Sequence, residues 1–296
     1  MATDKLNQIF NLQNGRKLGY AEYGDPNGKV VFHFHGSGGS RLEYPIEKSI
    51  LSNLEIRLIS IDRPGHGLSD PHPNRKLLDF PDNITELADH LKIDRFFVQG
   101  WSAGGPHALA CAYKLSDRIL AGAIISGAAP PNRPQPYKGL PLSHKLIMFI
   151  IRNFPKIMYS MRKGMYKAVA LEDNILAKNL IYSLTDVDKL IFNNSEYQSQ
   201  FIADVREGYK QGWGGPAQDD IVIMNQWWGF KLENIKQRID IWQGKQDTNV
   251  PFNHGIYQNK IIPNSRLIVL EKEAHLYLFK EWENVLSKLI EDKNIR

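Results

Sequence analysis

The sequence predicts an α/β protein in which one mostly parallel sheet is covered by helices on both faces and interrupted by a helical insertion. Short, continuous apolar runs alternate with amphipathic stretches over most of the chain, a pattern typical of strands buried between two helical layers. Between residues 130 and 228 this alternation stops, and it returns afterwards. A length of 296 residues with 42% apolar content fits one large domain that carries a sizeable insertion.

The expected elements follow in order along the chain. Residues 8–13 and 17–23 flank Asn14-Gly15, a dipeptide that favours the positive backbone angles of a tight turn, so we expect an antiparallel hairpin at the start. Six further apolar runs are predicted to be strands, at residues 30–34, 56–61, 96–98, 119–125, 239–242 and 267–270. An amphipathic helix is expected near residues 281–290.

The insertion divides the predicted core domain into two stretches of sequence. Residues 1–129 and 229–296 form this core, and residues 130–228 form a helical cap of about a hundred residues, within the usual size range of a small subdomain. The cap begins with a proline-rich stretch and continues as helical segments rich in Met, Tyr, Phe and Ile, for example residues 146–149 and 157–166.

Charge and cysteine content exclude several classes of protein. The net charge is +5, but Lys and Arg are interspersed with 32 acidic residues and form no long basic block, so we expect a solvated surface and no nucleic-acid binding. The single cysteine, Cys111, is expected to be a small buried apolar residue, and no metal cluster is predicted around it. Because no secretory signal or membrane-spanning run is present, we expect a cytoplasmic protein without membrane insertion.

The pentapeptide Gly100-Trp101-Ser102-Ala103-Gly104 is the main candidate for chemistry. It follows the apolar run 96–98 and precedes an Ala-rich helical stretch, so Ser102 is expected in a sharp strand-to-helix turn where small neighbours are required. The following helix N-terminus would offer backbone N–H groups to a developing oxyanion. A Gly-x-Ser-x-Gly pentapeptide arises by chance about 0.1 times in a chain of this composition. The motif is therefore informative only together with the predicted strand before it, the predicted helix after it and the further features described below.

A glycine-rich loop supplies a second candidate feature. His35-Gly36-Ser37-Gly38-Gly39-Ser40 comes directly after the predicted strand 30–34. Because glycine lets the backbone approach a ligand closely, we expect the N–H groups of Ser37 and Ala103 to form an oxyanion hole. A phosphate-binding loop is the alternative, but the Gly-Lys-Ser/Thr ending and the dinucleotide glycine spacing are both absent.

A nucleophilic serine needs a base, and the base needs an acid that holds its tautomer. If serine, acid and histidine follow one another in that order along the chain, only His254 and His275 come late enough to be the base. His275 follows the run 267–270 in a loop before the last helix and is the better base, whereas His254 is expected to be a surface or packing residue. Asp247 follows the run 239–242 at the carboxyl end of a predicted strand, which makes it the expected acid, although it could instead cap a helix.

These residues together resemble the α/β-hydrolase family over nearly the whole chain. The resemblance rests on the motifs around Gly36, Ser102, Asp247 and His275, and on Asp62-Arg63-Pro64-Gly65-His66-Gly67-Leu68-Ser69, which we interpret as a structural loop. It implies an eight-stranded, mostly parallel sheet with an antiparallel second strand and a helical lid between strands six and seven. One departure is that Ala274 precedes His275, where family members often carry glycine.

The favoured function is hydrolysis of a carboxylic ester by acyl transfer from Ser102 to water, with Asp247 and His275 completing a triad. The same residues would serve a carbon–carbon bond hydrolase, a thioesterase or an aminopeptidase, and a non-catalytic ligand sensor on this fold is a further alternative. An aminopeptidase would need cap carboxylates for a substrate ammonium, and Asp219-Asp220 or Glu196 are candidates, although a solvated helix face is the preferred interpretation of them.

Aromatic residues suggest where an apolar substrate binds. Besides Trp101, four aromatic residues of the cap are predicted to line an acyl pocket, namely Phe154, Tyr159, Trp213 and Trp227. The expected partner is a small apolar ester. No cofactor and no metal is predicted, because the triad supplies its own nucleophile and base. The oligomeric state is not predicted.

Overall fold

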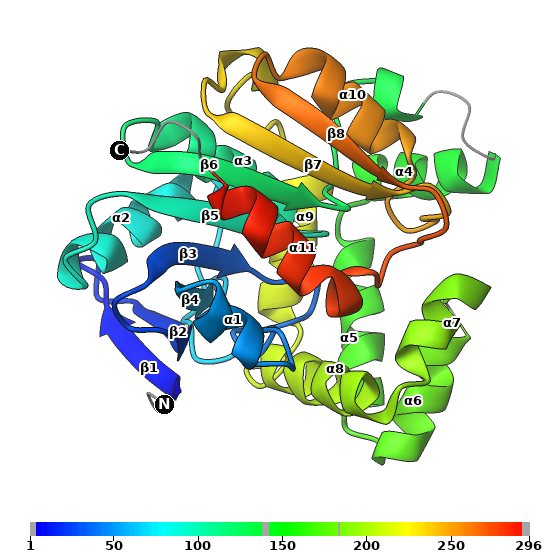
Figure 1. The fold of residues 1–296 in the computed structure, drawn as a ribbon. Helices are drawn as coiled ribbons and strands as arrows, with labels where there is room; N and C mark the ends of the chain where they lie inside the picture. The colour runs from blue at the N-terminus through cyan, green and yellow to red at the C-terminus, as the bar shows by residue number, and fades with distance from the viewer. Residues whose placement is uncertain (1–3, 138–141, 183, 292–296) are drawn as a thin grey trace.

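Eight strands form one sheet in the computed structural model, which describes residues 4–137, 142–182 and 184–291 (Figure 1). The spatial order is β1-β2-β4-β3-β5-β6-β7-β8. The bounds of the strands are β1 (Lys5–Asn11), β2 (Lys17–Gly24), β3 (Lys29–Phe34), β4 (Ile56–Ile61), β5 (Phe96–Trp101), β6 (Ile119–Ile125), β7 (Arg238–Gly244) and β8 (Ser265–Leu270). β2 runs antiparallel to both of its neighbours, and all other pairs are parallel. This confirms the expected mostly parallel sheet with an antiparallel second strand.

The hairpin turn lies where the sequence places it. Gly15 has a φ of +81°, which glycine adopts without steric cost, and its N–H donates to the carbonyl of Leu12 over 2.8 Å. β1 nevertheless begins and ends earlier than residues 8–13, with its first residue at Lys5. Its side chains are mostly exposed, so the apolar pattern is a weak guide to the ends of this edge strand.

Helices cover both faces of the sheet. One face carries α2 (Phe80–His90), α3 (Gly104–Lys114) and α10 (Asn253–Ile261), and the other carries α1 (Ser49–Asn53) and α11 (Leu278–Ile290) (Figure 1). Short 3-10 helices lie at Leu77–Asp79, Gln135–Tyr137 and Leu232–Asn234. Each strand contributes side chains to both faces in alternation, which is why the central strands read as continuous apolar runs.

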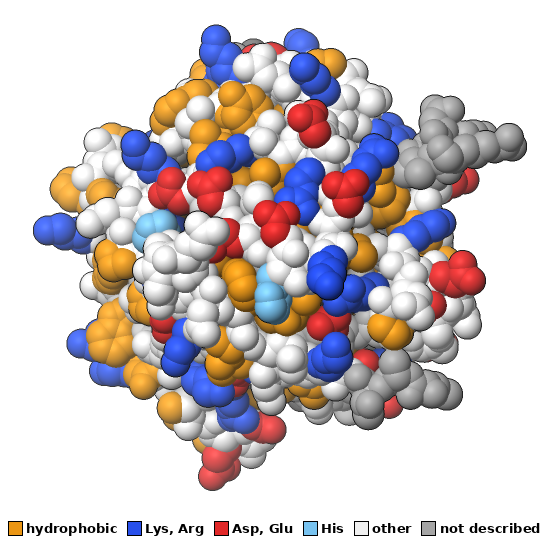
Figure 2. All heavy atoms as spheres, turned by 90° about the vertical axis from the view of Figure 1, so that its left-hand side faces the viewer, with side chains coloured by type: hydrophobic (Ala, Val, Ile, Leu, Met, Phe, Trp, Pro, Cys, Tyr) orange, Lys and Arg blue, Asp and Glu red, His pale blue; other side chains and the backbone are white. Residues whose placement is uncertain are grey.

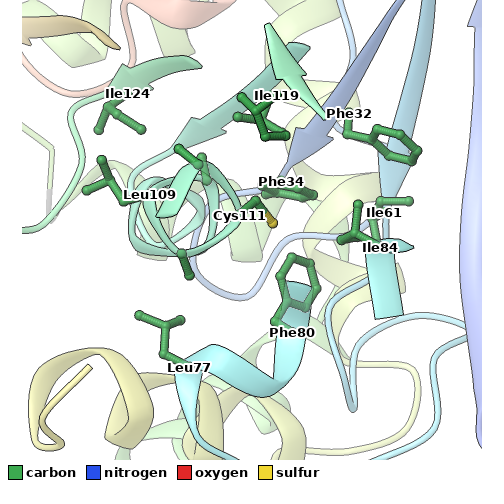
Figure 3. Close-up of a cluster of buried hydrophobic side chains, with 14 of the residues drawn as sticks. Phe32, Phe34, Ile61, Leu77, Phe80, Ile84, Leu109, Cys111, Ile119 and Ile124 are labelled. Carbon is green, nitrogen blue, oxygen red and sulfur yellow. The ribbon is translucent and has the colours of Figure 1, made fainter. Parts of the chain in front are cut away.

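Figure 3 shows the hydrophobic cluster on the α2 and α3 face. Phe32 and Phe34 from β3 point toward Phe80 and Ile84 of α2, and all four are at most 1% exposed. Full burial of such a side chain contributes about 1.5–3 kcal/mol. Cys111 of α3 lies in the same cluster with no exposed surface, and burial raises the pKa of its thiol well above the ordinary value. This confirms its interpretation as a small buried apolar residue.

Six helices lie between β6 and β7, where the resemblance implied a lid. They are α4 (Leu142–Asn153), α5 (Ile157–Val169), α6 (Asp173–Ile181), α7 (Asp186–Phe192), α8 (Ser195–Gly208) and α9 (Gly214–Met224). In Figure 1, α5 to α8 lie beyond the arrowheads of the parallel strands. The predicted cap, residues 130–228, includes 138–141 and 183, which lie outside the described residues. Its division from the core stays a prediction, and we call α4 to α9 the cap helices below.

Buried ion pairs join the cap helices to the sheet. Asp219 of α9 is 1% exposed, and its Oδ2 lies 2.8 Å from Nη2 of Arg63, which follows β4. Its Oδ1 accepts from Arg75, and both guanidinium groups are buried. Asp220 is 3% exposed. The interpretation of Asp219-Asp220 as a solvated helix face is therefore wrong, because α9 packs this pair against basic side chains distant in sequence.

The molecular surface on the left-hand side of Figure 1 carries charges of both signs. Figure 2 shows Lys and Arg interspersed there with Asp and Glu, and hydrophobic side chains between them. This arrangement is the one expected of a solvated surface. Among the residues described, no helix is both long and apolar enough to cross a membrane.

Candidate active site

Three strands end at the same edge of the sheet and bring the predicted catalytic residues together. Ser102 follows the last residue of β5, Asp247 lies three residues after β7, and His275 lies five residues after β8. Parallel strands place their carboxyl ends on one side, and this is where open α/β sheets bind their ligands. The residues converge although 173 positions separate Ser102 from His275.

Ser102 lies in a strained turn between β5 and α3. Its φ is +52°, a value uncommon for a residue with a side chain. The turn requires glycine on both sides, because a Cβ on Gly100 would lie 2.2 Å from the carbonyl oxygen of Gly104, and a Cβ on Gly104 would lie 1.9 Å from that of Phe34. The geometry matches the strand-to-helix turn that the pentapeptide predicts.

The side chains of Ser102, His275 and Asp247 form a hydrogen-bonded line. Nε2 of His275 lies 3.0 Å from Oγ of Ser102, and Nδ1 lies 2.8 Å from Oδ2 of Asp247. Because the carboxylate can only accept, Nδ1 carries the proton and Nε2 is free to accept the serine proton. The other carboxylate oxygen, Oδ1, accepts from the backbone N–H groups of Asn249 and Val250 over 2.9 and 2.8 Å, which fixes the acid in place.

The surroundings of His275 favour its protonated form. Burial lowers the pKa of the imidazole, but the charge of Asp247 and the hydrogen bond to it raise the pKa, and the net pKa lies above the ordinary value. Asp188 and Glu43 add smaller contributions in the same direction. A raised pKa means that the imidazolium formed when His275 takes a proton is stabilised, as a general base requires.

Two backbone N–H groups are available for a developing oxyanion. Ser37 and Ala103 both line the cavity described below, and no described residue accepts a hydrogen bond from either N–H. The Ser37 hydroxyl is engaged elsewhere, since it donates to Oδ1 of Asp220 and accepts from Nη2 of Arg162 over 3.0 and 2.5 Å. Arg63 supports the loop from below by donating to the carbonyl of Gly36 over 3.2 Å.

A cavity of about 560 Å³ opens above Ser102. Its lower wall contains Ser102, His275 and Trp101, and its upper wall consists mainly of apolar side chains from the cap helices, including Met165, Leu180, Leu184, Phe192, Phe201 and Ile223. A pocket of this size is suitable for a small organic ligand, and an apolar lining favours apolar groups.

Trp101 is the only predicted substrate-binding residue among the lining residues that the structure describes. Its indole N–H donates to the carbonyl of His275 over 3.1 Å, and a Cβ on Gly36 would lie 2.5 Å from its ring. Trp101 therefore packs between the glycine-rich loop and the histidine loop, and supports both.

The four predicted cap aromatics lie outside this cavity. Phe154 and Trp227 are 62% and 46% exposed, and the hydroxyl of Tyr159 donates to Gln218 over 3.0 Å. Trp213 packs against Tyr166, with ring centroids 5.3 Å apart. The structure thus assigns them no contact with the pocket. Only Tyr159 lies within a helix, α5, whereas Phe154, Trp213 and Trp227 lie just outside the helix ends, so their aromatic character did not reveal whether they face the cavity.

Asp188 of α7 is a site residue that sequence reasoning missed. Its Oδ1 accepts from the backbone N–H groups of His275 and Leu276 over 2.8 and 2.7 Å, and the residue is 1% exposed. The two hydrogen bonds hold the backbone of the histidine loop in place. No motif marks Asp188, because its partner lies 87 positions away.

His254 is a packing residue, as expected. It is 5% exposed, its Nδ1 accepts from the backbone N–H of Ala129 over 3.0 Å, and burial lowers its pKa to about 4. The described residues contain no group of three or more His, Cys, Asp or Glu side chains placed to hold a metal ion.

Comparisons with known proteins extend over most of the chain. A sequence profile of the α/β hydrolase fold matches residues 29–281. A probable proline iminopeptidase from Leptolyngbya boryana is 37% identical over 112 residues, which cover 36% of this chain and only 34% of that protein. A 2-hydroxy-6-oxo-6-phenylhexa-2,4-dienoate hydrolase from Comamonas testosteroni is 24% identical over 89% of this chain and 85% of that protein.

The solved structures agree on the fold. An esterase from Exiguobacterium antarcticum superimposes with a TM-score of 0.70 and 20% identity, covering 95% of this chain and 97% of that one. At this identity the likeness concerns the fold alone. The profile match, the strand order and the site at the carboxyl edge of the sheet agree, and the chain is a member of the α/β-hydrolase fold family.

Proposed function

We propose that the protein is a serine hydrolase that cleaves a carboxylic ester through an acyl-enzyme, with Ser102, His275 and Asp247 as its catalytic triad. The observation that carries the proposal is the hydrogen-bonded line from Oγ of Ser102 through His275 to Asp247, at the floor of a mainly apolar cavity. A serine in a strained turn, a base within 3.0 Å and an anchored acid together make an activated nucleophile.

The reaction proceeds in two half-reactions. Oγ of Ser102 attacks the ester carbonyl while Nε2 of His275 takes its proton, and the resulting oxyanion accepts hydrogen bonds from the N–H groups of Ser37 and Ala103. His275 then gives the proton to the leaving alcohol as the carbon–oxygen bond breaks. A water molecule enters, loses a proton to His275 and attacks the acyl carbon, and the proton returns to Ser102 as the carboxylic acid leaves. Asp247 stabilises the imidazolium in both halves.

Hydrolysis of p-nitrophenyl esters of short fatty acids tests the proposal. Ser102→Ala is expected to lower kcat by at least about a thousand-fold, since only the oxyanion donors and substrate binding remain. Ser52→Ala serves as the matched control, because Ser52 is an exposed serine on α1 and lies outside the cavity. Wild-type turnover by a folded Ser102→Ala variant would contradict the proposal.

An aminopeptidase is the second candidate, and a specific carboxyl group favours it. Asp204 of α8 lines the cavity and is 4% exposed, and its Oδ1 accepts from the backbone N–H and the hydroxyl of Ser40 over 2.8 and 2.7 Å. No described residue donates a hydrogen bond to its Oδ2, and no described Lys or Arg forms an ion pair with it. Burial raises the pKa of this carboxyl, and the nearby Glu43 carboxyl raises it further. A substrate ammonium group beside this carboxyl would favour its ionised form and pair with it.

The carboxylates that the sequence suggested for this role are less suitable. Asp219 is engaged by Arg63 and Arg75, and Asp220 is paired with Arg162 over 2.5 Å. Glu196 lines a separate groove near β1. Asp204 is therefore the candidate carboxylate for binding a substrate ammonium group, and an experiment on Asp204 can separate the esterase from the aminopeptidase.

A matched pair of substrates separates the two candidates. An aminoacyl amide and the corresponding des-amino ester carry the same acyl skeleton, and their products are identified by mass. Esterase activity predicts turnover of the ester alone, with a KM that Asp204→Asn leaves unchanged. Aminopeptidase activity predicts turnover of the amide, with a KM that Asp204→Asn raises. A thioesterase or a carbon–carbon bond hydrolase would use the same triad, and each would be recognised by turnover of its own substrate. A non-catalytic ligand sensor would bind these compounds and form no product.

A further inference from the structure

Positive charge is concentrated in one part of the chain. Residues 118–171 contain nine Lys and Arg and not a single Asp or Glu, whereas the remaining 28 Lys and Arg are outnumbered by 32 acidic residues. The net charge of +5 therefore comes from this one stretch. The expectation that Lys and Arg are interspersed with acidic residues therefore holds only outside this stretch, although no long basic block occurs within it either. The stretch includes α4 and α5, the first two cap helices.

The same two helices expose apolar side chains that no part of the described structure covers. On α4, Leu142, Leu146 and Phe149 are 82%, 55% and 58% exposed, and their spacing places them on one face of the helix. The exposed apolar residues continue through the turn and onto α5 with Phe154, Ile157 and Met161, which are 62%, 38% and 54% exposed. We call these six residues, together with the exposed Lys145 and Lys156, the α4–α5 surface.

This combination of side chains determines which partner fits. Several exposed apolar residues on neighbouring helices indicate an interaction site. The lysines beside them favour a negatively charged partner. A second copy of the chain would bring the same positive segment against itself, which is unfavourable. A nucleic acid would leave the apolar residues without a partner. An anionic lipid surface provides both negative headgroups and apolar acyl chains.

We propose that the α4–α5 surface docks the protein on anionic lipid surfaces. The apolar side chains enter the boundary between headgroups and acyl chains, and Lys145 and Lys156 pair with the lipid phosphates. The protein remains peripheral, since no described helix is long and apolar enough to span a bilayer.

The docking surface adjoins the candidate active site. Met161 belongs to the α4–α5 surface and also lines the cavity, and Met165, one turn further along α5, lines the cavity as well. Docking would therefore bring the cavity next to the lipid phase. This placement extends the proposed ester hydrolysis, on which it rests, to apolar esters that are dissolved in a lipid surface.

Vesicle flotation of the full chain tests the docking. One set of vesicles contains phosphatidylcholine alone, and the other contains equal parts of phosphatidylcholine and phosphatidylglycerol. We expect binding to the anionic vesicles that is lost at about 1 M salt, where the screening length falls to about 3 Å. Neutralising both lysines, in Lys145→Gln with Lys156→Gln, should weaken binding by about 25-fold, because each lysine near an anionic surface contributes about fivefold. Phe149→Ser should weaken it by about tenfold or more.

Matched controls carry the same substitutions elsewhere. Lys236→Gln changes an exposed lysine outside the α4–α5 surface, and Leu190→Ser changes a leucine of α7 that is 77% exposed. Both variants should bind anionic vesicles as the wild type does. The proposal is overturned if the wild type does not bind anionic vesicles, or if the α4–α5 variants bind as strongly as the controls. It is also overturned if the wild type is a dimer in solution and Phe149→Ser makes it monomeric.

Hydrolysis of a dissolved short-chain ester, measured in parallel, separates this proposal from the proposed function. The α4–α5 variants should retain the wild-type rate on the dissolved ester and lose rate only on an ester embedded in anionic vesicles. A wild type that hydrolyses the dissolved ester but does not bind vesicles refutes the docking alone. Vesicle binding combined with full ester turnover by Ser102→Ala would refute the esterase function and leave the docking in place.

Discussion

Removing the carboxylate of Asp219 should destabilise the protein strongly, because it holds two buried arginines. Its Oδ2 lies 2.8 and 3.0 Å from Nη2 and Nε of Arg63, its Oδ1 accepts from Arg75, and Nε2 of His107 lies 3.4 Å away. The side chains of Arg63 and Arg75 are 0% and 1% exposed. In Asp219→Ala, both guanidinium groups would remain buried without a counter-charge.

The expected loss follows from this burial. Removing one partner of a buried ion pair typically costs about 3–5 kcal/mol, a large part of the 5–15 kcal/mol of a typical folded domain. Burial raises the pKa of Asp219, but Arg63, His107 and Arg75 together hold it well below its ordinary value. Its contribution to stability is therefore complete above about pH 4, the ordinary carboxyl pKa, and is lost as the pH falls toward the depressed value.

Urea unfolding followed by tryptophan fluorescence measures the loss. With a slope of about 3 kcal/mol per molar urea, the midpoint for Asp219→Ala should fall by about 1–1.7 M. Asp219→Asn keeps one acceptor and should lose less. Asp186→Ala is the control, since Asp186 is 97% exposed in its pair with Lys189, and its midpoint should not change. A midpoint for Asp219→Ala equal to that of the control would refute the assignment of this ion cluster.

Three further predictions concern the base, its support and the cap. Because the pKa of His275 is raised, kcat/KM should fall as the pH drops through a value above 6.5, and a profile with its acid limb below 6.5 would contradict this. Asp188→Ala should lower kcat by up to about 100-fold with little change in KM, since His275 loses its anchor, and Asp188→Asn should restore part of the rate. Gly164→Ala should raise the free energy of unfolding by about 0.5–1 kcal/mol, because a Cβ at this position of α5 meets no atom within 4 Å, and a lower urea midpoint would count against it.

The sheet and the candidate catalytic residues were predictable because each is marked by a short stretch of sequence. Each central strand is buried on both faces, so its residues form a continuous apolar run that is visible in the sequence. The turn at Ser102 requires glycine at fixed positions, because Gly100 and Gly104 approach other backbone atoms closely. His275 and Asp247 follow strands whose carboxyl ends meet at one edge, so their order along the chain indicates their convergence.

The substrate cavity was not predictable, because its walls depend on how the cap helices pack. Phe154 and Trp227 are large and aromatic but exposed, whereas Met165 and Leu180 line the cavity. The roles of Asp188 and Asp219 depend on partners 87 and 156 positions away, and no local pattern reports such contacts. The excess of Lys and Arg in residues 118–171, by contrast, is visible in the sequence. It indicates a docking surface only together with the exposed apolar side chains of α4 and α5, which the structure provides.

Labelling with a fluorophosphonate probe tests whether Ser102 is an activated nucleophile. The probe phosphonylates an activated serine, and peptide mapping by mass spectrometry locates the adduct. We expect an adduct on Ser102 alone, which is absent in Ser102→Ala and forms more slowly as the pH falls and His275 becomes protonated. A folded wild type that remains unlabelled, or that is labelled at a different serine, would contradict this expectation.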